Sequence, residues 1–540
     1  MATIPSLAMI PSGVKASKLY SVLPTDGTGD FTVSRGTGAT GLKHRVNSEL
    51  NLEIIDANVP ALNYDAIGGC PVLNTEPQST NLITYPISYG NSYWTKSGAT
   101  IEGDPSTAGS ELITNVNDRD FSSSTIGNWT LNANGTGTTF AASAFDGKTS
   151  SLITAGTSTT YAHTILSTSF TSGFVDGNTY RIKALVYVPS ANTNESIYIG
   201  VRNIDGGDRI QRPVITDSWS EIDYTFTVGA DVIGDIHIGF LSATTNGDKC
   251  YITDVSIKEV QGYSAPSVDF TTSAFKLVED TGTGNHRIYS DNCAVGVGGA
   301  FSTTIYVKNN GRNWFQIRDD IDVGHVYFDV ANGVIGSTQG GATGTIDLMS
   351  DGWYKCTFSF VNAGDGNDRF QFFLSDADGS VSYTGDGTSG VYIFNAQLET
   401  GSAATSPTFT DTTLAAEGST STRLADAVTG AGDVNTFNSS EGVLFIETSK
   451  PDNGLNGMIS IWDGTSSNYV EIEFSSATDK VNGLIVGGGI NSYPQYNSPT
   501  PLNEMNKIAI RWNSTSFSLW FNGIKVVEDL TGIPIISGIN

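Results

Sequence analysis

The chain has 540 residues and a formal net charge of −27, and Asp, Glu, Lys and Arg make up only 15% of it. So acidic a surface opposes binding to nucleic acid, which requires that phosphates be neutralised, and it opposes docking on anionic lipid. Gly occurs 61 times, and no apolar stretch has a persistent helical period or the length to span a membrane. We therefore predict an all-β chain of several antiparallel β-sandwich (jelly-roll) domains in series, with no nucleic-acid partner and no membrane insertion.

Residues 1–85 carry only short apolar runs between turns rich in Gly and Asn. Examples are FTVS (Phe31 to Ser34) and LEII (Leu52 to Ile55). A segment of this kind buries little apolar surface and gains order by packing on a partner. We therefore interpret residues 1–85 as an extended attachment segment.

Three runs near the N-terminus together carry a family resemblance. They are Ser17 to Asp65, which begins SKLYSVLPTDGTGDFTVSRG, then CPVLNTEPQSTNLITY (Cys70 to Tyr85) and NSYWTKSGATI (Asn91 to Ile101). In this order they resemble the start of tailed-bacteriophage fibre, spike and tail structural proteins. Where that family usually has ATRVN, this chain has GATGLKHRVN (Gly38 to Asn47), which we interpret as a longer turn. The resemblance implies that residues 1–85 attach the chain to other virion proteins and that the chain forms a homotrimer.

Residues 108–261 form the second part, in which apolar and polar residues alternate along most runs. TYRIKALVYVP (Thr179 to Pro189) and KCYITDVSIKEV (Lys249 to Val260) are examples. Alternation of this kind predicts strands with one wet face. The order of the runs resembles the β-sandwich of carbohydrate-binding modules, which implies a jelly roll. It implies sugar binding less directly, because that fold serves many functions.

The same resemblance suggests candidate site residues in this part. In carbohydrate-module sandwiches a structural calcium ion often joins the start of the domain to its final strand, and the matching oxygen ligands would be Asp118 or Asp120 together with Asp254. The alternative is that these are simple turn and surface carboxylates. Tyr198 and Tyr251 are candidates for stacking on a glycan from a concave sheet face, and packing within the sandwich is the alternative.

Residues 262–405 contain FSTTIYVKNNGRNWFQIRDD (Phe301 to Asp320) and resemble the sandwich of phage head-spike and fibre proteins. In that family the NSYWTKSGATI strand leads straight into the rest of the domain, whereas here residues 108–261 intervene. An inserted domain is tolerated at an exposed loop when its two ends lie close together. We therefore predict one fibre-type sandwich made of residues 86–107 plus 262–405, with residues 108–261 inserted into it.

Residues 406–540 contain NKIAIRWNSTSFSLWFNGIKVVED (Asn506 to Asp529), which resembles laminin-G and concanavalin-like sandwiches. Such domains usually add one or two strands after this point. We therefore expect residues 406–540 to form a sandwich that is incomplete at its C-terminus.

Residue patterns for catalysis are absent from the sequence. No GxSxG, HExxH or dense His/Asp cluster occurs, and His237 in IGDIHIGF is interpreted as a strand-face residue. Acidic pairs such as Asp319 and Asp320 lie in turn-like contexts, where Asp is favoured anyway.

The four cysteines include no CxxC pair, which favours buried free thiols over a zinc site. The start MATIPSLAMIPSG lacks the pattern of a signal peptide. Together these observations predict a protein that is not an enzyme.

We interpret the chain as a structural component of a tailed-phage virion: a fibre, spike or tail appendage assembled in the host cytoplasm and exposed on the particle. A host-surface glycan is the expected external partner. Two alternatives stay open. One is a glycan-binding adhesin without a structural role in a virion. The other is a secreted carbohydrate-active enzyme with accessory binding modules, against which the missing catalytic pattern counts.

Overall fold

The computed structural model describes residues 4–539 apart from 12–13, 16, 104–110, 158–160, 167–173, 194–195, 215, 241–244, 261, 321–323, 363, 365, 409–417, 451–456 and 476–478. The described residues are almost entirely strands and turns, with one α-helix, α1 (Asn117–Asp120), and two short 3-10 turns. All strand pairings within the sheets are antiparallel, as in Tyr187 opposite Trp219. The predicted all-β fold class is confirmed. Among the described residues, no helix has the length and apolar character to span a membrane.

The chain divides into two compact units, and the second is a single continuous stretch within the first. One unit is Met1–Glu102 with Ser264–Asn540, and the other is Gly103–Tyr263. The ends of the second unit lie beside each other, because a Cβ atom on Gly103 would fall 2.5 Å from the ring of Tyr263. Neighbouring ends are what an inserted domain requires.

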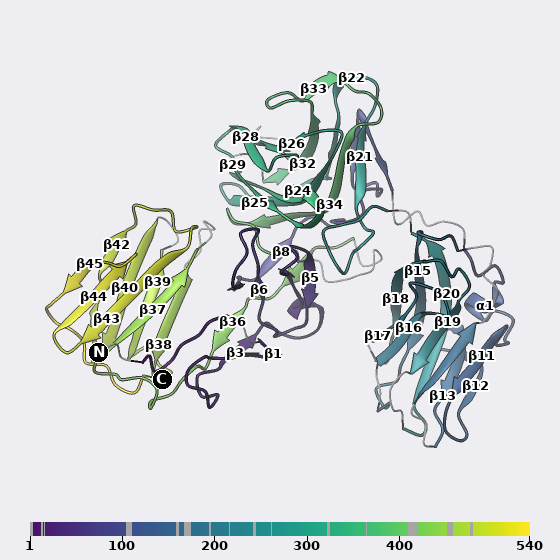
Figure 1. Ribbon diagram of the computed structural model, residues 1–540, viewed down its shortest axis with the longest axis horizontal. Helices are drawn as coiled ribbons and strands as arrows, with labels where there is room; N and C mark the ends of the chain where they lie inside the picture. Colours follow the sequence, from purple (N-terminus) through teal and green to yellow (C-terminus); the bar gives the residue numbers. More distant parts are fainter. Residues whose placement is uncertain are drawn as a thin grey trace. The chain divides into compact units, whose positions relative to one another are not determined.

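The unit Gly103–Tyr263 is a sandwich of two five-stranded sheets. Sheet 1 has the order β11 (Trp129–Ala133), β14 (Ala162–Leu166), β19 (Asp235–Phe240), β16 (Ser196–Arg202) and β17 (Arg209–Pro213) (Figure 1). Sheet 2 has the order β12 (Thr139–Phe145), β13 (Lys148–Thr154), β20 (Lys249–Glu259), β15 (Thr179–Tyr187) and β18 (Trp219–Thr227). Burial alternates along β15, so one side of each strand fills the core between the sheets.

The other unit contains a sandwich of two six-stranded sheets. The first has the order β10 (Ala99–Glu102), β21 (Phe275–Glu279), β34 (Gly390–Thr400), β25 (Ala300–Asn310), β30 (Trp353–Val361) and β29 (Thr343–Leu348). The second has the order β28 (Val334–Gln339), β27 (His325–Asp329), β26 (Trp314–Asp319), β32 (Phe370–Ser375), β23 (Arg287–Tyr289) and β9 (Thr95–Ser97). Two small sheets accompany them: β22 (Thr283–Asn285) with β33 (Ser382–Thr384), and β24 (Cys293–Ala294) with β31 (Asn367–Asp368).

The two strands that precede the second unit belong to this sandwich. β9 pairs with β23, and β10 pairs with β21. Trp94, just before β9, is 1% exposed and lies in the same core as Phe372 of β32, with ring centroids 5.7 Å apart. Its indole N–H donates to the carbonyl of Tyr85 at 2.9 Å. Residues on both sides of the break therefore share one hydrophobic core.

The N-terminal stretch pairs with residues 421–429 of the same chain. β1 (Val14–Lys15), β2 (Lys18–Leu19) and β3 (Phe31–Ser34) form a sheet with β36 (Ala427–Thr429), and β8 (Ser79–Asn81) pairs with β35 (Ser421–Arg423). The N-terminal stretch also contains two small two-stranded sheets. They are β4 (Lys43–Val46) with β5 (Leu52–Ile55), and β6 (Leu62–Asn63) with β7 (Val72–Leu73).

Buried ion pairs hold this stretch. Asp426 bonds the guanidinium of Arg35 and the ammonium of Lys43, both at 2.7 Å, and Glu76 lies 3.1 Å from Lys43 and from Arg423. The side chains of all three cations have no exposure to solvent. The sequence leads us to expect order supplied by another protein, yet the described part of this stretch finds its partners within the chain. Asp426 lies more than 300 residues from both Arg35 and Lys43, beyond the reach of any local pattern.

The C-terminal part is a further sandwich. One sheet has the order β37 (Gly442–Thr448), β43 (Asn506–Asn513), β44 (Ser516–Phe521) and β45 (Ile524–Asp529). The other has the order β38 (Gly457–Trp462), β39 (Tyr469–Phe474), β40 (Lys480–Gly487) and β41 (Ile490–Ser492), with β42 (Gln495–Asn497) also paired to β40. Ile536 and Ile539, which follow the last strand, are buried in the core of this sandwich.

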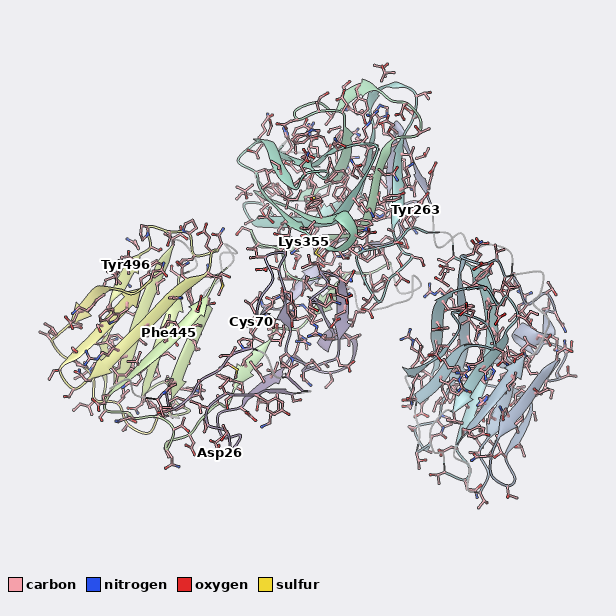
Figure 2. The ribbon with its side chains drawn as sticks, in the orientation of Figure 1. Asp26, Cys70, Tyr263, Lys355, Phe445 and Tyr496 are labelled. Carbon is pink, nitrogen blue, oxygen red and sulfur yellow. The ribbon has the colours of Figure 1, made fainter. Side chains whose placement is uncertain are left out.

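Two side chains of the C-terminal sandwich that are labelled in Figure 2 differ in how far they are buried. Tyr496 packs on Phe521, with ring centroids 5.4 Å apart, whereas Phe445 on β37 is 56% exposed (Figure 2).

All four cysteines are free thiols; Cys70 is exposed and the other three are buried. The prediction of buried thiols is therefore wrong for Cys70, which lies in a surface turn just before β7.

Candidate functional site

Sheet 1 places an unusual set of side chains on the face that points away from the core. On β19, His237 lies between two isoleucines of the core and therefore faces outward. The register sets Gly239 of β19 between His163 of β14 and Tyr198 of β16. Because Gly239 has no side chain, the rings of His163 and Tyr198 approach across it, with centroids 5.2 Å apart.

These rings belong to a larger group that we call the histidine–tyrosine cluster: Tyr161, His163, Tyr198, Arg209 and His237. The rings of His163 and His237 stack at 5.0 Å, and Tyr161 lies 5.6 Å from His163. The guanidinium of Arg209 lies 5.1 Å from the ring centre of Tyr198, and its Nη1 donates to the Tyr198 hydroxyl at 3.3 Å. Four strands or their ends therefore supply one continuous polar and aromatic patch.

Gly239 is needed for this arrangement. Its φ of +147° is one that L side chains rarely adopt. A Cβ atom there would also lie 2.6 Å from the carbonyl oxygen of Ala162. A larger residue would therefore push β14 and β19 apart and separate the rings of His163 and Tyr198.

Three members of the cluster are buried, and the ring nitrogens of its two histidines have no hydrogen-bond partner among the described residues. His163 is 3% exposed, His237 7% and Tyr198 0%, although none of the three belongs to the hydrophobic core of the unit. Both ring nitrogens of both histidines lack a hydrogen-bond partner among the described residues. Buried polar groups are nearly always paired, and each unpaired group costs about 1–3 kcal/mol. Four such nitrogens on one face can take hydrogen bonds from water or from a ligand.

Both imidazoles are neutral at neutral pH. Burial lowers the pKa of His163 to about 3, and the neighbouring His237 and Arg209 add to the effect. Burial and Arg209 lower the pKa of His237 to about 4, against a smaller opposing effect of Asp235. A neutral imidazole carries one N–H donor and one nitrogen acceptor. The pair therefore matches groups that both donate and accept, of which hydroxyls are the commonest.

The two tyrosines singled out by the sequence lie on different sheets. Tyr198 belongs to the cluster on sheet 1, whereas Tyr251 lies on the outward face of sheet 2. There the ring of Phe145 stacks on Tyr251 with centroids 4.0 Å apart, and Tyr187 meets it edge-on at 6.0 Å. Tyr251 is only 6% exposed. The two tyrosines cannot contribute to one site. The unpaired ring nitrogens of His163 and His237 lie on the same face as Tyr198.

The three candidate calcium ligands each have nitrogen partners. The carboxylate of Asp118 accepts from the backbone N–H and side-chain amide of Asn128 at 2.8 and 2.7 Å. Asp120 accepts from the backbone N–H of Ser122 at 2.9 Å, and Asp254 pairs with Lys148 at 3.1 Å. In the part of the chain that the structure describes, no three His, Cys, Asp or Glu side chains are grouped so that they could hold a metal ion. We therefore base no calcium site on these residues.

His163 and Arg209 carry no signal in the sequence that marks them as site residues. The alternation in IGDIHIGF does place His237 on a strand face, as predicted. No spacing in the sequence links His163 to His237, which lie on neighbouring strands of the sheet but more than 70 residues apart. Only the register of β14 against β19 brings their rings together.

One comparison with known proteins matches part of this unit. Residues 114–238 match the model of a family described as a carbohydrate binding domain. The matched stretch contains every member of the histidine–tyrosine cluster. No curated protein matches the chain. Together the sandwich and the family match define a carbohydrate-binding-module type of domain within residues 103–263.

Several solved structures share some likeness with the chain. The CBM22-1-CBM22-2 tandem domain of Paenibacillus barcinonensis Xyn10C has a TM-score of 0.23 and 13% identity, covering 54% of this chain and 98% of that chain. The CBM22-1 xylan-binding domain of the same protein has a TM-score of 0.23 and 19% identity, covering 29% and 98%. The CBM22-1-GH10 modules of Clostridium thermocellum Xyn10B, complexed with xylohexaose, have a TM-score of 0.21 and 15% identity, covering 29% and 30%.

Proposed function

We propose that the chain is a glycan-binding protein without catalytic activity, and that its unit Gly103–Tyr263 binds carbohydrate at the histidine–tyrosine cluster. One observation carries the proposal. Four buried ring nitrogens that have no partner among the described residues lie on a single outward face, inside the stretch that matches a carbohydrate binding domain. The remainder of the site is chemically consistent with a sugar ligand.

Sugar hydroxyls both donate and accept hydrogen bonds, as neutral imidazoles do. Binding sites commonly combine apolar and aromatic walls with a few placed polar groups that fix the orientation of the ligand. His163 and His237 would supply such polar groups, and the partly exposed ring of Tyr161 would supply an aromatic surface. A bound hydroxyl would satisfy nitrogens that otherwise cost folding free energy.

The test compares matched variants of the full chain by affinity electrophoresis in gels that contain one soluble polysaccharide each, xylan included. We expect His163→Ala and His237→Ala to weaken binding at least about tenfold, because each removes a hydrogen-bonding group from the site. Tyr251→Ala serves as the control, since it removes an aromatic side chain from the opposite sheet of the same sandwich. Melting temperatures establish that each variant is folded. Loss of binding in Tyr251→Ala, with His163→Ala unaffected, would place the site on sheet 2 and refute our assignment.

The resemblance of residues 17–101 to tailed-phage fibre and spike proteins suggests on which particle this glycan binding would occur. We propose that the chain is an appendage exposed on a virion, that it associates with other virion proteins and with copies of itself, and that its glycan lies on the host surface. The proposal is supported by the resemblance alone. Mass spectrometry of purified particles tests it, since an appendage must be present in them. Release of reducing sugar from a bound polysaccharide would contradict the non-catalytic assignment.

A further inference from the structure

We infer that the glycan bound at the histidine–tyrosine cluster carries a carboxylate, as in a uronic acid, and that Arg209 pairs with it. The inference rests on the proposed function and specifies its substrate class. Arg209 opens β17 at the edge of sheet 1 and lies against Tyr198. Among the described residues no carboxylate pairs with its guanidinium, although the chain contains 55 Asp and Glu residues against 28 Lys and Arg.

The guanidinium of Arg209 is already oriented. Its Nη1 atom donates to the Tyr198 hydroxyl at 3.3 Å, and its Cζ lies 5.1 Å from the centre of the Tyr198 ring. A guanidinium has five N–H donors in a fixed fork, and this contact uses one of them. The edge formed by Nε and Nη2 is left for a planar carboxylate, which Arg binds through two parallel hydrogen bonds. These two contacts with Tyr198 restrict the Arg209 side chain, which reduces the side-chain entropy lost when an anion binds.

Arg209 is the cation at the cluster for which no carboxylate partner occurs among the described residues, in a chain that is strongly acidic. Arg209 lowers the pKa of both His163 and His237, and Arg202 lowers that of His237 as well, so both cations act on this face. Two acids lie nearby: Asp208 is 3.6 Å from Arg202, and the carboxylate of Asp235 accepts a hydrogen bond from Asn203. Neither is paired with Arg209. At 0.1 M ionic strength exposed charges interact only within about 10 Å. A ligand at the cluster therefore experiences mainly Arg209 and its neighbours and little of the net charge of −27.

The experiment uses the full chain and polysaccharides in matched forms: glucuronoxylan, polygalacturonate and alginate, each native and after chemical reduction of its carboxylates to alcohols. Affinity electrophoresis gives the dissociation constant for each form. We expect the native form of at least one polysaccharide to bind about tenfold or more tightly than its reduced form, as a charge-assisted pair predicts.

Variants assign the effect to Arg209. Arg209→Gln should weaken binding of the native form by about the same factor and should weaken binding of the reduced form much less, so that the preference for the native form is lost. Arg209→Lys should recover only part of the affinity, because an ammonium cannot form the paired hydrogen bonds. The control is Lys183→Gln on β15 of sheet 2, which removes one positive charge from the opposite sheet and should have no effect.

Three outcomes would overturn the inference. They are equal binding of native and reduced forms, wild-type affinity in Arg209→Gln, or tighter binding of dextran sulfate than of every uronate. In each of these cases glycan binding itself survives, and so does the proposed function. If wild type binds no polysaccharide in either form, the proposed function fails together with the inference.

Discussion

His163 and His237 occupy outward-facing strand positions, where side chains are usually hydrated, and yet both are buried with their ring nitrogens unpaired. The alternation of apolar and polar residues correctly predicts that His237 lies on a strand face. It cannot predict that His163 stacks on it, because the contact depends on the pairing of β14 with β19 and on the absence of a side chain at Gly239. Tyr198 was recognised from the sequence as a candidate, whereas its partner Arg209 was not.

The lowered pKa values make a prediction about acid stability. In the folded chain the imidazoles stay neutral down to about pH 4 for His237 and about pH 3 for His163, whereas in the unfolded chain they take up protons below about pH 6.5. The unfolded state therefore binds more protons in this window. The free energy of unfolding should fall as the pH drops from about 6.5 to about 4, by at most about 1.4 kcal/mol per pH unit for each imidazole.

Calorimetric melting of the full chain between pH 7 and pH 4 measures this dependence. Because carboxylates titrate in the same range, the comparison is with the double variant His163→Gln with His237→Gln. The melting temperature of the unit Gly103–Tyr263 should fall less steeply with acid in the variant than in the wild type. Identical slopes would show that the two histidines are charged, or accessible to protons, in the folded state.

Strands and their partners were predictable to different degrees. Alternating runs such as β15 and β20 predict strands with one buried face, and both lie in the predicted stretches. The pairing of the N-terminal stretch with β35 and β36 was not predictable. It depends on buried charges, and a sequence pattern shows that Arg35 and Asp426 are charged but not that they meet across 391 positions.

Those buried charges give a prediction about the N-terminal stretch. Asp426 is 3% exposed, and it bonds Arg35, Lys43 and the backbone N–H of Glu76. Asp426→Asn removes the charge that compensates two fully buried cations, so we expect a loss of about 3–5 kcal/mol of stability and early proteolysis within residues 17–80. Chemical denaturation measures the loss.

Asp254→Asn is the matched control for that substitution. It breaks the pair with Lys148, in which both side chains are at least 39% exposed, so its effect should stay below about 1 kcal/mol. Equal effects of the two substitutions would show that the N-terminal stretch does not depend on its buried ion pairs.

At the scale of the whole molecule, the all-β architecture follows from alternation and frequent Gly in the sequence. β10 and β21 pair with each other, and residues 103–263, which lie between them in the sequence, form a separate compact unit. The ends of that unit meet at Gly103 and Tyr263. Replacing residues 103–263 with a short Gly-Ser linker should therefore leave the core around Trp94 intact, with its melting transition unchanged.

This shortened chain gives the most direct test of the central claim, which is that glycan binding belongs to the unit Gly103–Tyr263. Wild type and the shortened chain are compared by affinity electrophoresis against the polysaccharide that wild type binds most tightly. We predict that the shortened chain is folded and migrates as it does in a gel without polysaccharide. Retention of wild-type affinity in the shortened chain would contradict the account, because binding would then reside outside the unit that holds His163, Tyr198 and His237.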